Sequence, residues 1–228
     1  MDWPSIIERN AERLIAVLTE LFVMAGFGRG GTALMPRNVC RALLILLRPT
    51  ESAVRRLIIM AARGIVVKLR DAGVSRAFPA GLVLNRDADR VAAFGLIDPL
   101  KRFAPEGFEW GRKEPQVMPR ISIPGLFDPV FPLPAPLPAD DDLISPNAIR
   151  RRLLALRHAL DTLPRQAKRL ARWRARLGLK RIGRLSPFRP GFAPGFHRTK
   201  PREIDAILGD CHYFARQAWA EWARPDTS

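Results

Sequence analysis

Between residues 105 and 138 a proline occurs every few positions, and this spacing constrains the fold more than any other feature of the chain. Proline lacks the backbone N–H and restricts the residue before it, so neither a helix nor a central strand persists through such a run. Residues 131–138 are predicted to form extended polyproline II, a semi-rigid spacer. We therefore expect an irregular Pro-rich region or linker over residues 76–142, with regular structure on both sides.

Residues 1–75 are predicted to form an N-terminal helical bundle, because apolar residues recur there at helical spacing. This spacing indicates three helices, over residues 4–26, 37–47 and 50–70. Pro49 is expected to end the second helix, and Thr50 to act as the N-cap of the third. In the middle region, two apolar segments (residues 81–84 and 91–97) flank a polar stretch and suggest a short β-hairpin.

Residues 143–228 are predicted to form a basic helical segment. Ser145 and Pro146 suit the start of a helix, and apolar residues then recur every three or four positions. This apolar seam comprises Ile149, Leu153, Leu156, Leu160, Leu163, Ala167 and Leu170. Pro164 interrupts it, which leaves two interpretations open: one kinked helix, or two helices that meet at residues 161–164. We favour the break.

The end of the chain is expected to hold one more helix. Residues 178–200 contain four glycines and three prolines and are predicted to lack regular structure. A last helix is expected from Pro201 to Arg224, with Trp219 and Trp222 buried on its apolar stripe. The predicted class is therefore mainly α-helical.

The positive charge of the chain is concentrated in one quarter of its length. The whole sequence has 38 Lys and Arg against 22 Asp and Glu, a net charge of +16. Residues 148–202 hold 17 of these bases and one acid, Asp161, while the rest of the chain is balanced. Clustered guanidinium groups bind phosphates bidentately and release counterions from nucleic acid, so this segment predicts an anion-binding site.

Candidate anion-binding residues are the cations around the outer side of the apolar seam and just beyond it: Arg150, Arg151, Arg157, Arg165, Lys168, Arg169, Arg172, Arg174, Arg176, Lys180, Arg181 and Arg184. Trp173 and Phe188 lie among these arginines and are candidates for stacking on exposed bases. The alternative interpretation is a solvated basic helix face, whose charge serves solubility or pairs with the acids of an acidic protein partner.

The sequence contains no pattern typical of an enzyme. We find no arrangement that supplies a nucleophile, a base and an orienting group, no metal-ligand spacing among the three histidines and two cysteines, and no phosphate-binding loop. We therefore expect no catalytic residues, no metal and no cofactor. The N-terminus lacks the cationic region of a signal peptide, and no apolar stretch is long enough to span a membrane, so a cytoplasmic location is expected, with peripheral contact to the inner membrane left open.

Five segments together resemble a family of small, Arg-rich alphaproteobacterial proteins of unknown function. They are Met1-Asp2-Trp3 with the helix that follows, residues 51–58, residues 163–176, residues 186–191 and residues 203–212. The resemblance covers most of the chain outside the Pro-rich region. It implies a bacterial, cytoplasmic setting and carries no activity, cofactor or catalytic residue.

The function predicted from the sequence is non-catalytic binding of an anionic partner through residues 148–202, with DNA or RNA first. Two alternatives remain. In one, the protein lies on an anionic membrane surface, with residues 14–27 and 57–67 in the interface. In the other, it is a helical adaptor, and the apolar seam packs on a protein partner.

Overall fold

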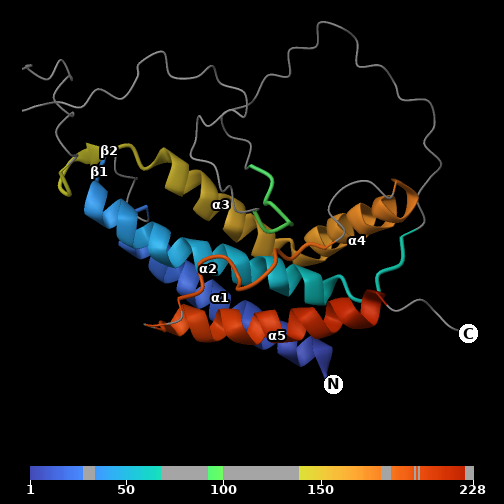
Figure 1. Ribbon diagram of the computed structural model, residues 1–228. Helices are drawn as coiled ribbons and strands as arrows, with labels where there is room; N and C mark the ends of the chain where they lie inside the picture. Colours follow the sequence, from blue (N-terminus) through green and yellow to red (C-terminus); the bar gives the residue numbers. More distant parts are fainter. Residues whose placement is uncertain are drawn as a thin grey trace, which may run out of the picture. The chain divides into compact units, whose positions relative to one another are not determined.

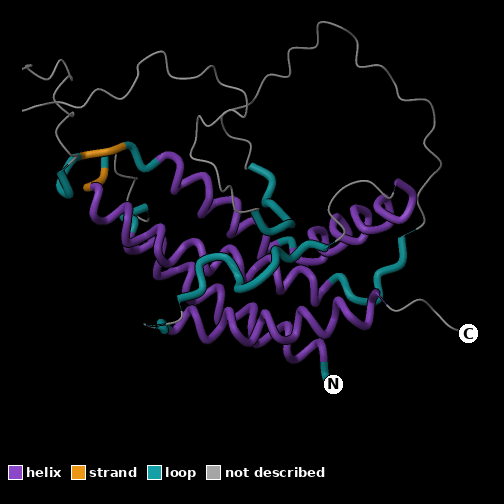
Figure 2. Tube along the Cα trace, viewed as in Figure 1, coloured by secondary structure: helices purple, strands orange, loops and turns teal. Residues whose placement is uncertain are grey.

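The computed structural model describes residues 1–27, 34–67, 92–99, 139–180, 186–197, 199 and 201–223. These residues are mainly α-helical, which confirms the predicted class (Figures 1 and 2). The elements in chain order are α1 (Trp3–Met24), β1 (Met35–Pro36), α2 (Arg37–Ala61), β2 (Leu143–Ile144), α3 (Asn147–Asp161), α4 (Leu163–Lys180) and α5 (Glu203–Ala223).

Helix α2 is the central element, and each of the other four helices packs against it (Figure 1). Every residue from Ser52 to Met60 is buried, so this part of α2 is enclosed on all sides. The N-terminal and C-terminal helices therefore share one core, in a unit that comprises residues 1–99 and 140–228. The sequence-based division into separate helical parts at 1–75 and 143–228 does not correspond to this unit.

The structure differs from the sequence prediction at Pro49, because α2 passes through this residue without a break. Proline has no N–H to donate to the carbonyl four residues earlier, which belongs to Ile45. The guanidinium of Arg202 donates to that carbonyl instead, at 2.9 Å. Thr50 is inside the helix rather than at its N-cap, and its hydroxyl donates to the carbonyl of Leu46 at 2.7 Å. A side chain from a distant part of the sequence thus satisfies the carbonyl that Pro49 leaves without a donor.

Gly195 allows the segment 186–197 to approach α2 at this point. Its φ is +83°, and a Cβ atom at this position would lie 2.5 Å from the backbone nitrogen of Pro49. Any other residue would therefore be strained and would clash with α2. At its other end α2 stops at Ala61, before the predicted limit at residue 70.

The only strands among the described residues pair distant parts of the chain. Met35 lies opposite Ile144, and Pro36 opposite Leu143, in an antiparallel pair. The backbone carbonyls of Asp142 and Asp140 accept from the N–H groups of Arg37 and Asn38 at the start of α2. The predicted hairpin is not formed over residues 92–97, which contain no strand; its remaining residues and most of the Pro-rich region lie outside the described residues.

The C-terminal helices follow the sequence prediction in most respects. Helix α3 ends at Asp161 and α4 begins at Leu163, so the chain breaks where Pro164 favoured a break. The Thr162 carbonyl accepts from the N–H groups of Arg165 and Gln166 and thereby starts α4. Helix α4 continues to Lys180, three residues beyond residue 177, where regular structure was predicted to end, and α5 lies where the last helix was expected.

Candidate anion-binding surface

Four cations form a line along the exposed face of α4. Arg165, Lys168, Arg172 and Arg176 are separated by three, four and four residues, and all four are exposed. At this spacing side chains lie on one face of a helix, and the line extends over about 17 Å. We call these four residues the α4 cation stripe.

None of the four has an ion-pair partner among the described residues. Other exposed arginines are paired, as in the contacts of Arg13 with Asp210 and of Arg41 with Asp140, at 3.1 and 2.9 Å. The charge of the α4 cation stripe is therefore not balanced within this part of the structure and faces solvent.

The stripe is exposed because the opposite side of α4 carries the apolar seam. Ala167 and Leu170 are buried, as are Ile149, Leu153 and Leu156 of α3, and both helices pack on α2. The seam belongs to the protein's own core. A partner helix has no access to it in this structure.

Helix α3 contributes two further exposed cations, Arg150 and Arg151, without an ion pair among the described residues. Arg157 differs, because its guanidinium contacts the carboxylate of Asp161 one turn later at 3.1 Å. Both partners are half-exposed, so this pair is weak and only partly reduces the local charge.

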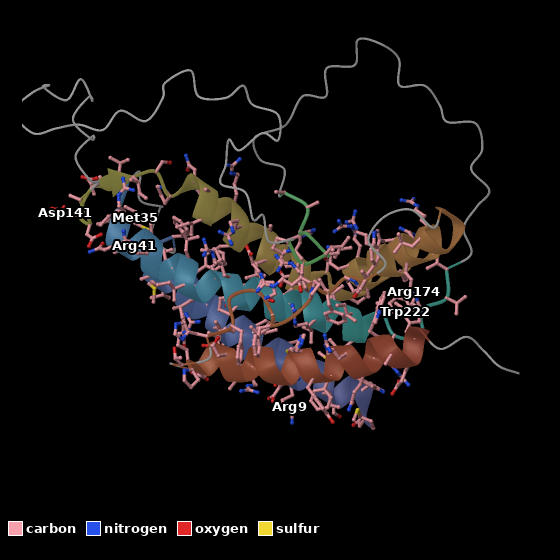
Figure 3. The ribbon with its side chains drawn as sticks, in the orientation of Figure 1. Arg9, Met35, Arg41, Asp141, Arg174 and Trp222 are labelled. Carbon is pink, nitrogen blue, oxygen red and sulfur yellow. The ribbon has the colours of Figure 1, made fainter. Side chains whose placement is uncertain are left out.

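Two predicted anion-binding residues face inward instead. The guanidinium of Arg174 lies 4.2 Å from the ring centre of Trp222 and 5.3 Å from that of Trp219, and it donates to the Trp222 carbonyl (Figure 3). The guanidinium of Arg169 donates to the Phe94 carbonyl at 3.3 Å. The sequence spacing could have predicted the inward orientation of Arg174, because this residue is two positions from both Arg172 and Arg176 and so lies on the opposite face of the helix.

The two candidate stacking residues are not equivalent in the structure. Trp173 is half-buried against the core. Phe188 is buried, with its ring edge-on to His212 and Trp219, and the guanidinium of Arg56 lies over it. Phe188 is thus part of the core and does not present the exposed ring that was expected of it. Arg181, Arg184 and the side chain of Lys180 lie outside the described residues.

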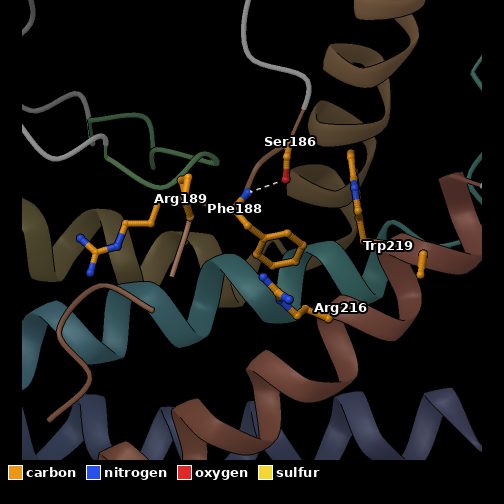
Figure 4. A pocket seen from close by; sticks show the side chains of 7 residues that line it. Ser186, Phe188, Arg189, Arg216 and Trp219 are labelled. Atoms are coloured by element: carbon orange, nitrogen blue, oxygen red, sulfur yellow. Dashed lines mark hydrogen bonds between the residues drawn. The ribbon is translucent and has the colours of Figure 1, made fainter. Parts of the chain in front are cut away.

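A pocket of about 490 Å³ lies where the segment after α4 crosses α5 (Figure 4). Its lining combines aromatic rings with guanidinium groups: Ser186, Phe188, Arg189, Pro190, Arg216, Trp219 and Ala220. Trp219 was predicted to be a buried core residue, yet it is only half-buried and borders this pocket. Arg216 was not among the predicted site residues, because it lies outside the basic segment 148–202.

A buried polar cluster beneath Phe188 was also missed. Arg56, whose side chain is 1% exposed, binds Asp98 with two hydrogen bonds of 3.2 and 2.9 Å, and its Nε donates to Nδ1 of His212 at 3.0 Å. Burial, together with the charges of Arg56 and Arg216, lowers the pKa of His212 to about 4. The histidine is therefore neutral at pH 7. The signal in the sequence was the pair Arg55-Arg56 within an otherwise apolar helix face.

No protein-family model matches the chain, and the comparisons found no similar curated protein or solved structure. Within the described residues there is no group of three or more His, Cys, Asp and Glu side chains placed to hold a metal ion. None of the described helices is long and apolar enough to cross a membrane.

Proposed function

We propose that the protein is a non-catalytic binder of a polyanion and that this polyanion is a nucleic acid. In this proposal the α4 cation stripe contacts the phosphates of the nucleic acid. The observation that carries this proposal is the alignment along one helix face of four exposed cations that have no ion pair among the residues the structure describes. Three of the four are arginines, whose planar fork matches phosphate oxygens.

The length of the stripe suits a nucleic-acid backbone. At about 17 Å it matches about five steps of one strand, since neighbouring nucleotides are about 3.4 Å apart along the duplex axis. Arg150 and Arg151 extend the positive surface onto α3. The pocket beside Trp219 is lined by both aromatic rings and guanidinium groups. Proteins that bind single-stranded nucleic acid stack the bases on such side chains.

The burial of the apolar stretches also favours this proposal over its alternatives. Leu14, Leu18 and Leu21, which a membrane-surface protein was expected to insert, are buried in the core, and so are residues 57–60. The apolar seam that an adaptor would present is buried too. Single apolar residues of these stretches, such as Val23 and Val66, are exposed, whereas the α4 cation stripe aligns four exposed charges for a partner to contact.

The test is a salt series with matched charge variants. Arg172→Gln/Arg176→Gln removes two cations of the stripe, and Arg9→Gln/Arg48→Gln removes two exposed arginines from α1 and α2. Binding to duplex DNA and to RNA is measured by fluorescence anisotropy from about 50 to 200 mM salt. We expect the slope of log K against log[salt] to become shallower by about 2 units in the stripe variant and to change little in the control.

Equal slopes for the two variants would mean that net charge alone drives binding, and would contradict a role for the stripe. Vesicles of neutral lipid, with and without an anionic lipid, are tested in parallel. Clear binding to the anionic vesicles, without measurable binding to DNA or RNA at about 50–100 mM salt, would overturn the nucleic-acid proposal in favour of a membrane surface.

A further inference from the structure

A second pocket, of about 360 Å³, lies between α2, α3 and the segment 92–95. Its lining combines small residues with three arginines and one acid: Glu51, Arg55, Ala92, Ala93, Phe94, Gly95, Ala148, Arg151, Arg152 and Ala155. Alanines and a glycine leave the space open, while the guanidinium groups give it a positive potential. This pocket is distinct in its residues from the α4 cation stripe.

The acid in the lining is already neutralised. Nε and one terminal nitrogen of Arg152 donate to the two carboxylate oxygens of Glu51, at 2.8 and 3.0 Å. This bidentate pair leaves the second terminal nitrogen of Arg152 without a hydrogen bond among the described residues. The carboxylate of Glu51 therefore presents less repulsion to an anion than an unpaired acid would.

Arg55 is the unusual group in this pocket. Its side chain is 10% exposed, and its Nε donates to the carbonyl of Gly95 at 3.1 Å. Its two terminal nitrogens make only long contacts, 3.5 Å to Glu51 and 3.7 Å to Asp98, and neither donates a hydrogen bond to a described residue. The guanidinium also lies 5.6 Å from the ring centre of Phe94, which holds it at the edge of the pocket. Its terminal nitrogens can therefore donate to an acceptor that enters the pocket.

The charge balance points the same way. Three guanidinium groups and one carboxylate leave the lining with a net charge of +2. Burial lowers the pKa of Arg55, and the carboxylates of Glu51 and Asp98 only partly oppose this effect. Arg151, at the pocket, is exposed and has no ion pair among the described residues. The pocket thus holds unused donors from three arginines around one space.

We propose that this pocket binds a phosphate monoester, with Arg55, Arg151 and Arg152 as its donors. A monoester carries a charge of about −1.5 to −2 at pH 7 and three acceptor oxygens, which match the charge of the lining and its unused donors. The phosphate belongs either to a small phosphorylated molecule or to the 5′ end of a nucleic-acid strand. Both sources share the same recognised group.

The first arm of the test measures binding of inorganic phosphate to the full chain by calorimetry, with chloride at matched ionic strength as the reference. We expect saturable binding of one phosphate per chain, and a rise in melting temperature that chloride does not reproduce. Arg151→Gln should weaken binding by about tenfold or more, because it removes a charge-assisted donor. Arg9→Gln removes the same charge from an exposed position on α1 outside the lining; it is the matched control and should leave binding within about twofold.

Arg55→Lys keeps the charge of the buried position but loses the planar fork, and it should also weaken phosphate binding by about tenfold. Circular dichroism checks whether Arg55→Lys is folded. If Arg55→Lys does not fold, Arg151→Gln still tests the site, because Arg151 is at an exposed position. The stripe variant Arg172→Gln/Arg176→Gln should bind phosphate as the wild type does. Failure of the nucleic-acid proposal therefore leaves this result unaffected.

The second arm distinguishes the two sources. Glycerol 3-phosphate is compared with glycerol, and a short oligonucleotide with a 5′-phosphate is compared with one that has a 5′-hydroxyl. A preference for the phosphorylated member of only one pair identifies the source. The proposal is overturned if phosphate and chloride have equal effects, or if Arg9→Gln weakens binding as much as Arg151→Gln does.

Discussion

The guanidinium of Arg202 donates a hydrogen bond of 2.9 Å to the carbonyl of Ile45, the group that Pro49 leaves without its helical donor. The two residues are far apart in the sequence, and their contact joins the start of α5 to the middle of α2. The contact is exposed, so the guanidinium supplies in place of water the donor that the proline lacks, and a hydrogen bond of this kind contributes about 1 kcal/mol.

This relationship predicts coupling between Arg202 and Pro49. Arg202→Met should lower the free energy of unfolding more in the wild type than in a Pro49→Ala background, where the introduced alanine would supply the missing N–H. The difference should be about 1 kcal/mol, measured by urea unfolding of the four proteins. The contacts of Arg202 with Asp205 are present in both backgrounds and cancel. Additive effects of the two substitutions would contradict this role for Arg202.

The buried pair of Arg56 and Asp98 should be sensitive to the loss of one partner. Asp98→Leu leaves the Arg56 guanidinium buried without its carboxylate, and should lower the free energy of unfolding by about 3–5 kcal/mol. Arg56→Met/Asp98→Leu should be more stable than Asp98→Leu alone, because no uncompensated charge remains at that contact. The control is Asp140→Asn, which breaks an exposed pair with Arg41 and should cost less than about 1 kcal/mol. Equal losses for Asp98→Leu and Asp140→Asn in chemical unfolding would argue against the cluster as a stabilising unit.

The lowered pKa of His212 predicts a particular dependence of stability on pH. The folded protein holds this imidazole neutral down to about pH 4, whereas the unfolded chain protonates it near its ordinary pKa of about 6.5. The unfolded state therefore binds more protons between these values, so stability falls as the pH decreases from about 6.5 to about 4. His212→Gln should remove this component of the pH profile, and His158→Gln on α3 serves as the control. Identical profiles for the wild type and His212→Gln would contradict the prediction.

Arg172 and Arg174 are two residues apart on α4 and should have opposite phenotypes. Arg174→Gln loses the contacts with Trp219 and Trp222, and should lower the free energy of unfolding by about 1–2 kcal/mol while leaving the salt slope of nucleic-acid binding unchanged. Arg172→Gln should leave stability within about 0.5 kcal/mol and reduce that slope by about 1 unit. Urea unfolding followed by tryptophan fluorescence, together with anisotropy titrations, separates the two effects. A reduced slope in Arg174→Gln would place Arg174 at the binding surface instead.

The sequence by itself determined the features that depend on neighbouring residues. Pro164 and the residues before it set the break between α3 and α4, and the three- and four-residue spacing of apolar side chains set the mainly helical class. The concentration of bases in residues 148–202 was also evident. Caps, helix periodicity and local charge all act over a few positions, so they can be recognised from the sequence.

The tertiary structure decided which of these local preferences prevailed. Pro49 does not end a helix, because Arg202 supplies a donor that only the folded chain brings to Ile45. Arg174 does not face solvent, because two tryptophans of α5 lie beside it, and Phe188 is buried over the pair of Arg56 and Asp98. Each outcome depends on a partner distant in the sequence, which no local pattern specifies.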